Sequence, residues 1–223
     1  MAVKIELFKS LPHFQGLGSD DLESIQKLIF EKFYDRNEII LYEGEDSDAL
    51  YFIADGVVKA FKTSNDGKEQ ILYINRPGDS LNDIPAFDRG PNPVSAQAMG
   101  PVSLYGIRIR DMENLLNEYP RIAYNVIYVI SNRARHFVSL IEDLSFKHVI
   151  GRVAKILLEY IKDESVAKPR LTQQDMAAMA GTAREVIGRS LKSLEDEGLI
   201  RLERQRVVLK DEEALKELAG VES

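Results

Sequence analysis

Residues 171–210 have the sequence LTQQDMAAMAGTAREVIGRSLKSLEDEGLIRLERQRVVLK, and this stretch decides the fold of the C-terminal third of the chain. Two short amphipathic helices are indicated, LTQQDMAAMA and AREVIGRSLKSLEDEG, with Gly181 in the tight turn between them. Thr172 is a good N-cap for the first helix, and Asp175 follows three residues later, close to a capping box. LIRLERQRVVLK is typical of a two-stranded hairpin. The order helix, turn, helix, hairpin predicts a winged helix-turn-helix.

The second of these helices has one apolar face and one polar face. Three apolar residues share the first face and are expected to pack inward: Ile187, Leu191 and Leu194. Arginine can bond O6 and N7 of guanine together, and glutamate can accept a hydrogen bond from the amino group of cytosine. We therefore predict that Arg184, Glu185 and Arg189 contact DNA bases. The alternative is that Glu185 and Arg189 form only a surface ion pair one helical turn apart.

A basic face next to this helix is predicted to contact phosphates, which position a protein on DNA without reading its sequence. The whole chain has a formal charge of −7, but residues 148–223 hold 13 basic and 14 acidic residues and are nearly neutral. A local basic face can bind DNA although the whole chain is acidic. The electrostatic field of distant acidic residues is screened by salt over about 8–10 Å, so the local charge decides. The predicted phosphate contacts are Thr172, Gln173, Thr182, Lys192, Arg204 and Arg206.

The N-terminal half has a different pattern. After short helical turns in residues 5–30, with Ser19 as a predicted N-cap, short β-branched and aromatic runs alternate with Gly, Asn, Asp and Pro turn signals. SNDGKE, residues 64–69, has the composition of a hairpin turn. Many short strands with regular turns predict a jelly roll or small barrel, here called the β-roll. The fold class is therefore α+β.

A long helix is predicted after Pro120. Apolar residues recur along it at intervals of 4, 3, 4, 3, 4 and 3, which is an unbroken heptad seam. Because so narrow a seam favours a second helix of the same kind, we predict a homodimer, with part of the helix also packed on its own β-roll; the alternative is a helix packed only on its own β-roll. The seam residues are Ala123, Ile127, Ile130, Ala134, Phe137, Ile141 and Leu144.

Composition excludes several classes of protein. The chain has 223 residues and no cysteine, so disulfides, thiolate zinc sites and cysteine-held iron–sulfur clusters are excluded. No apolar run approaches a membrane span and no signal-peptide pattern opens the chain, so we expect a soluble cytoplasmic protein without membrane contact. No nucleophile and base set, glycine-rich phosphate loop or metal cluster is apparent, so we expect no enzyme.

The combination of motifs resembles the family of bacterial regulators that includes the cyclic-AMP receptor protein and the fumarate–nitrate regulator. The likeness covers nearly the whole chain through IILYEGEDSDALYFIADGVVKAF, LSFKHVIGRVAKILL and the helix-turn-helix. It implies a homodimer with a sensory β-roll (1–119), a dimerisation helix (120–147) and a winged helix-turn-helix domain (148–223), and RNA polymerase as a partner. Arg184, Glu185, Gly188 and Arg189 match the cyclic-AMP receptor type, since the fumarate–nitrate type would have serine in place of Gly188. The resemblance implies double-stranded DNA with palindromic TGTGA-like half-sites.

The stretch NDIPAFDRGPNPVSAQA, residues 82–98, corresponds to the phosphate-binding cassette of the family. In its cyclic-nucleotide binders a Gly–Glu pair holds the ribose and an Arg–Ser pair neutralises the phosphate. Asn82 and Asp83 stand at the first pair and Asn92 and Pro93 at the second, while Arg89 is the one cation of the stretch. The expected effector pocket comprises Asn82, Asp83, Ile84, Arg89, Asn92, Pro93, Val94, Phe137 and Val138, the last two at the family's adenine-contacting positions.

Cyclic AMP is not expected in this pocket, because burying a phosphate without a cation costs several kcal/mol. PNPVSAQA resembles the corresponding stretch of haem-linked, nitric-oxide-responsive regulators, so haem is one possible cofactor and His13 a candidate axial ligand; the alternative for His13 is an ordinary surface residue. An apolar organic effector and no effector are two further alternatives. We expect a DNA-binding regulator, effector-gated or effector-independent; the alternative class is a ligand-binding module without DNA.

Overall fold

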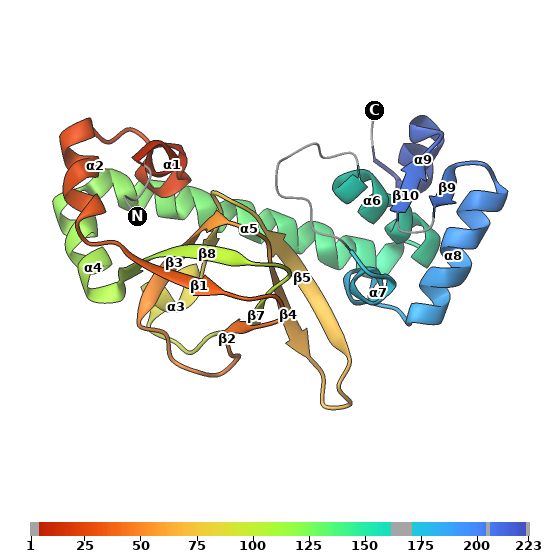
Figure 1. Cartoon of the computed structure of the whole chain (residues 1–223), viewed down its shortest axis with the longest axis horizontal. Helices are drawn as coiled ribbons and strands as arrows, with labels where there is room; N and C mark the ends of the chain where they lie inside the picture. The colour runs from red at the N-terminus through yellow and green to blue at the C-terminus, as the bar shows by residue number, and fades with distance from the viewer. Residues whose placement is uncertain (1–4, 162–170, 204–205, 222–223) are drawn as a thin grey trace. The chain divides into compact units, whose positions relative to one another are not determined.

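The computed structural model describes residues 5–161, 171–203 and 206–221. The chain forms two compact units, one from Met1–Lys62 and Tyr73–Phe137 and the other from Thr63–Leu72 and Val138–Ser223. The three-part division expected from the sequence remains a prediction. Each unit is described by itself below, and Figure 1 gives the element labels.

Two antiparallel sheets form the β-roll, and their strands belong to the first unit except for the parts of β4 and β5 that fall within Thr63–Leu72 (Figure 1). One has the strand order β1-β8-β3-β6 and the other the order β2-β7-β4-β5. Small and branched side chains such as Ala49, Val58 and Leu104 fill the space that the strands enclose. The bounds are β1 (Phe30–Tyr34), β2 (Ile39–Leu41), β3 (Ala49–Asp55), β4 (Val58–Thr63), β5 (Glu69–Asn75), β6 (Ser80–Leu81), β7 (Ser95–Ala98) and β8 (Val102–Arg108).

Helices cover the outer side of the β1-β8-β3-β6 sheet with an aromatic core. Phe8, Phe14 and Phe52 are fully buried there; the rings of Phe8 and Phe14 stack, and the ring of Phe52 packs against both at an angle. The helices are α1 (Ile5–Ser10), η1 (Pro12–Phe14), α2 (Ser19–Gln26), α3 (Asp83–Asp88) and α4 (Ile109–Glu118). The N-cap of α2 is Gly18 rather than the predicted Ser19, because the backbone N–H of Gly18 donates to the Asp21 carboxylate.

The long helix predicted after Pro120 is α5 (Pro120–Phe146). It has two apolar faces. Ile122 and Val126 are buried in the aromatic core of the first unit, so this inward face anchors the helix to the β-roll. The predicted seam lies beside it, with Ile127 and Ile141 63 % and 62 % exposed.

The second unit has the predicted winged helix-turn-helix, formed by α6 (Val149–Ile161), α7 (Gln173–Ala180), α8 (Arg184–Asp196), β9 (Ile200–Glu203) and β10 (Arg206–Leu209). A further helix that was not predicted from the sequence, α9 (Glu212–Ala219), packs on α6 through Leu215 and Ala219. The α+β class with β-roll, long helix and winged helix-turn-helix is confirmed.

Candidate functional site

The first helix of the helix-turn-helix is fixed at both ends. The backbone N–H of Asp175 donates to Thr172 Oγ1 at 3.1 Å, and the N–H of Thr172 donates to Asp175 Oδ2 at 2.9 Å, which completes the predicted capping box. Gly181 ends α7 with φ +63°, a left-handed conformation that glycine adopts without strain. The turn angle between α7 and α8 is therefore set by local backbone chemistry.

The inward face of α8 is as predicted. Ile187, Leu191 and Leu194 are buried against α6 and α7 in one apolar cluster. Because these three side chains fix the rotation of the helix about its own axis, the opposite face has to point outward. The cluster thus determines which residues of α8 are offered to a partner.

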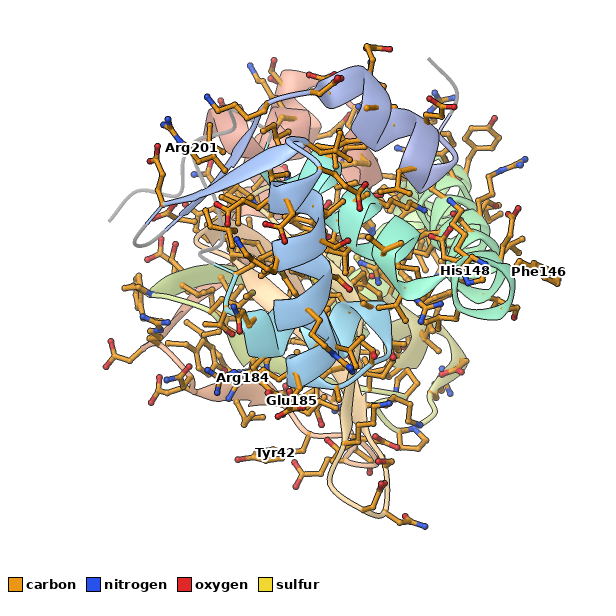
Figure 2. All side chains as sticks on the ribbon, turned by 90° about the vertical axis from the view of Figure 1, so that its right-hand side faces the viewer. Tyr42, Phe146, His148, Arg184, Glu185 and Arg201 are labelled. Carbon is orange, nitrogen blue, oxygen red and sulfur yellow. The ribbon has the colours of Figure 1, made fainter. Side chains whose placement is uncertain are left out.

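The predicted base-reading residues lie on that outward face. Arg184, Glu185 and Arg189 are all exposed, and Figure 2 shows Arg184 and Glu185 at the first turn of α8. Within the part of the chain that the structure describes, no ion pair joins Glu185 to Arg189. Their charged ends therefore remain available to hydrogen-bond with an external molecule.

The six predicted phosphate contacts differ in how exposed they are and in the partners they already have. Gln173 is exposed, whereas Thr172 Oγ1 is already used in the capping box and Thr182 is half-buried. Lys192 is paired with Asp196 at 2.9 Å and Glu195 at 3.2 Å, and these hydrogen bonds raise its pKa. Its charge is thus offset inside the helix, which weakens the prediction of a phosphate contact. Arg204 and the side chain of Arg206 lie outside the described residues.

Arg201 lies on the wing, the hairpin of β9 and β10, which is rich in basic residues. It is not among the residues predicted from the sequence to contact DNA. It is exposed on β9, where it pairs with Glu203, and Figure 2 places it on the hairpin that follows α8. The available signal was the density of basic residues between 201 and 210.

The cassette of the first unit is collapsed around a buried carboxylate. Asn82 caps α3 with φ +78°, in a left-handed conformation that asparagine tolerates, and this turn directs Asp83 into the interior. Asp83 receives a hydrogen bond from Ser80 Oγ at 2.8 Å and lies 2.9 Å from His13 Nε2. Burial alone would raise the pKa of Asp83, but the His13 hydrogen bond and the charge of Arg133 lower it below its ordinary value.

The cation of the cassette comes from the long helix. Arg133 on α5 places Nη1 2.6 Å from Asp83 Oδ2, and its Nη2 donates to the backbone oxygen of Ser80. Its guanidinium lies over the Tyr73 ring, 5.3 Å from the ring centroid. Arg133 is missing from the predicted pocket, because a cation was expected only within residues 82–98.

Six of the nine predicted effector-pocket residues do lie together. Together with Arg133 they line a cavity of about 20 Å³: Asn82, Asp83, Ile84, Asn92, Pro93 and Val94. A cavity of this size holds about one water molecule, whereas ligand pockets typically measure about 300–1,000 Å³.

The other three predicted pocket residues lie outside this cavity. Arg89 ends α3 with φ +60°, which turns its side chain out to pair with Glu113 at 2.7 Å. Phe137 packs on the Tyr73 ring, and Val138 is exposed to solvent. None of the three lines the 20 Å³ cavity.

His13 is a buried residue and not the ordinary surface residue of the alternative interpretation. It is 1 % exposed, its ring packs edge-on against Phe52, and its Nε2 is held by Asp83. Its backbone oxygen accepts a hydrogen bond from the side chain of Asn125 on α5 at 2.9 Å. His13 therefore joins η1, α3 and α5, and an axial bond through Nε2 would have to break its contact with Asp83.

Membrane spans and metal clusters are both absent from the described residues. Those residues contain no helix that is long and apolar enough to cross a membrane. They also contain no cluster of three or more histidine, aspartate or glutamate side chains arranged to hold a metal ion.

Comparison with known proteins matches both the N-terminal and the C-terminal part of the chain to known domain families. Residues 31–119 match the model of the cyclic nucleotide-binding domain, and residues 151–218 match that of the Crp-like helix-turn-helix domain. The chain is 30 % identical over 209 residues to a CRP-like cAMP-activated global transcriptional regulator of Mycobacterium tuberculosis, covering 91 % of this chain and 93 % of that protein. It is 29 % identical over 211 residues to the cyclic AMP receptor protein of Thermus thermophilus, covering 95 % and 98 %. Among solved structures it is similar to FixK2 from Bradyrhizobium japonicum, with a TM-score of 0.76, 24 % identity and coverage of 87 % and 99 %.

Proposed function

The chain belongs to the Crp/Fnr family of DNA-binding transcription regulators, and from this premise we propose that it acts as a homodimer on palindromic DNA with TGTGA-like half-sites. The observation that carries the proposal is the outward face of α8. Arg184, Glu185 and Arg189 are exposed there on a helix whose opposite face is buried. A helix that is held in place on one side and exposes polar side chains from its first two turns can enter the major groove and hydrogen-bond with base edges.

Each of the three side chains has a distinct proposed role. Arg184 and Arg189 donate pairs of hydrogen bonds to O6 and N7 of guanines, and Glu185 accepts one from the amino group of a cytosine. Gln173, at the N-terminus of α7, contacts a phosphate and sets the register of the domain on the duplex. The finding that Lys192 is paired with two acids makes it the weakest of the phosphate candidates.

The exposed face of α5 supports the dimer. Large apolar side chains recur along it at helical spacing and are more than half exposed: Tyr124, Ile127, Tyr128, Val138 and Ile141. A contiguous apolar stripe of this kind usually marks an interface. Covering it with the same stripe of a second copy gives the two-fold symmetry that a palindrome requires.

Binding to DNA is the direct test of the proposed function. We expect a duplex with two TGTGA-type half-sites, centred one helical turn apart, to bind at least about a thousandfold more tightly than a scrambled duplex at physiological salt. Fluorescence anisotropy with both duplexes measures the ratio. Equal affinity for the two duplexes would contradict a sequence-specific regulator.

The effector of the β-roll is proposed to be something other than cyclic AMP, in contrast to the names of the two relatives. Their names describe activation by, or reception of, cyclic AMP, but the cassette of this chain has Asn92 and Pro93 where a cyclic-nucleotide binder needs its Arg–Ser pair. The guanidinium of Arg133 is already paired with Asp83, and the cavity holds about one water.

Cyclic AMP is therefore expected to leave the melting temperature of the protein unchanged. A ligand at a hundred times its dissociation constant adds about 2.7 kcal/mol to the free energy of unfolding, which differential scanning fluorimetry detects readily. Adenosine, which lacks the phosphate, serves as the control. A rise in melting temperature with millimolar cyclic AMP but not with adenosine would refute the proposal.

A further inference from the structure

The 20 Å³ cavity of the first unit is lined by oxygen acceptors that lack donors. Asn82 and Asn92 are 8 % and 3 % exposed, and the side-chain oxygen of each is buried with no hydrogen-bond partner among the described residues. The orientation of both amides is fixed, because the nitrogen of Asn82 donates to the Ala49 carbonyl at 2.9 Å and that of Asn92 donates to the Tyr42 carbonyl at 3.0 Å. The two free positions are thus carbonyl oxygens, which accept N–H or O–H donors.

The third acceptor of the cavity is charged. Asp83 keeps its carboxylate fully buried, and every partner that it has donates a hydrogen bond or carries positive charge: Ser80, His13 and Arg133. An anion entering this cavity would meet the Asp83 carboxylate and two unpaired carbonyl oxygens, so only Arg133 would favour it. A cation that donates N–H groups would find three acceptors there: the Asp83 carboxylate and the side-chain oxygens of Asn82 and Asn92.

One such cation already occupies the cassette. The guanidinium of Arg133 donates to Asp83 and Ser80, lies over the Tyr73 ring and is only 20 % exposed. Its side chain comes from α5, whereas the acceptors belong to β6, to α3 and its N-cap, and to the loop that follows α3. Planar donor geometry, a buried carboxylate and an aromatic surface together are the features that recognise a guanidinium group.

We propose that the pocket of the cyclic nucleotide-binding domain is a guanidinium site, and that the side chain of Arg133 is its resident ligand. This inference rests on the proposed function in that it names the ligand chemistry of the sensory domain. It has two consequences. The internal ligand connects α3 to α5 without any diffusible molecule, and an effector of this pocket has to be a small guanidinium compound that displaces Arg133.

Chemical rescue tests the proposal. Arg133→Ala leaves Asp83 buried without its cation, so the melting temperature is expected to fall by roughly 10 °C. Methylguanidinium chloride at millimolar concentration is expected to restore a substantial part of this loss. Tetramethylammonium chloride at the same ionic strength has the charge but no N–H donor, and we expect no rescue by it.

Two controls isolate the pocket. Arg36→Ala removes an exposed arginine from the turn between β1 and β2, so neither a large loss nor a rescue is expected. The melting temperature of the wild-type protein should change much less with methylguanidinium than that of Arg133→Ala, because the compound first has to displace a tethered side chain whose effective concentration is in the millimolar range. Should Arg133→Ala be insoluble, refolding yield with and without methylguanidinium gives the same readout, and Arg133→Gln, which keeps most of the side-chain volume, gives a second folded variant.

Each outcome decides the proposal. Selective rescue by methylguanidinium supports it. Equal response to the two cations, no response to either, or stabilisation of Arg133→Ala by phosphate would overturn it. The rescue is measured by thermal melting without DNA, so its failure is distinguishable from failure of the proposed function. The proposed function would fail in a separate experiment, if the wild-type protein bound palindromic and scrambled DNA equally.

Discussion

Replacing Arg184 or Arg189 by alanine is expected to weaken binding to the palindromic duplex by roughly 5- to 150-fold for each guanine that is no longer bound, and to leave binding to scrambled DNA almost unchanged. The reason is that a bidentate arginine–guanine pair contributes about 1–3 kcal/mol of discrimination against the wrong base. Both side chains are exposed on α8 with no internal ion pair among the described residues, so neither substitution should disturb the fold. The preference is expected to relax at one base pair for each residue.

The matched control is Gln173→Ala. Gln173 lies at the first position of α7 and is exposed, so its loss should remove a phosphate contact and weaken binding to all sequences alike. Anisotropy titrations with matched, singly mismatched and scrambled duplexes separate the two effects. If Arg184→Ala and Arg189→Ala weakened matched and scrambled DNA equally, these arginines would be phosphate contacts and the TGTGA assignment would have to be withdrawn.

The helix-turn-helix could be predicted well from the sequence because its determinants are local. The capping residues Thr172 and Asp175 are three positions apart, and Gly181 sets the turn through its own φ angle. The helical period alone places Ile187 and Leu191 on the buried face of α8. Where a structure depends on neighbours within one or two turns, residue type and spacing are sufficient to predict it.

The pocket was predicted less well because its determinants are distant in the sequence. Arg133 meets Ser80 across 53 positions, and His13 meets Asp83 across 70. Neither pairing follows from the period of a single element. One signal was available: Ile122, Val126 and Arg133 share a helical stripe next to the predicted seam, and an arginine that continues an apolar stripe needs a buried partner. The prediction that part of α5 also packs on the β-roll names no residues for that contact, and this second stripe supplies them.

Helix α9 was missed for a different reason. No helix is predicted after the wing, yet Asp211 is followed by two glutamates, an apolar pair four residues apart and Gly220, which is the usual composition of a short capped helix. Asp211 Oδ1 accepts a hydrogen bond from the N–H of Ala214 at 3.0 Å, and Leu215 is fully buried. The sequence therefore contained the information, since both the cap and the apolar pair are local features.

Replacing Ile141 by aspartate is expected to convert the protein to monomers and to lower its affinity for the palindrome by roughly 10²- to 10⁴-fold, which is the gain that linking two binding units typically provides. Ile141 is 62 % exposed on α5, yet it lies on an apolar stripe that the proposed partner covers. In a two-fold symmetric interface each residue of the stripe lies close to its own copy, so one substitution places two carboxylates together in apolar surroundings. Burying them unpaired costs several kcal/mol, and this cost opposes dimerisation through the stripe.

Phe33→Asp is the matched control, because Phe33 is also a large apolar residue that is highly exposed, at 70 %, but it lies on the edge strand β1. Sedimentation velocity at micromolar concentration is expected to show dimers for the wild type and Phe33→Asp and monomers for Ile141→Asp. Thermal melts show whether each variant is folded. Dissociation by Phe33→Asp alone would place the interface on the sheet edge, and a monomeric wild type would contradict the dimer. A folded monomer of Ile141→Asp would still present one α8, so it should keep the preference for a single half-site while losing the affinity that comes from contacting two.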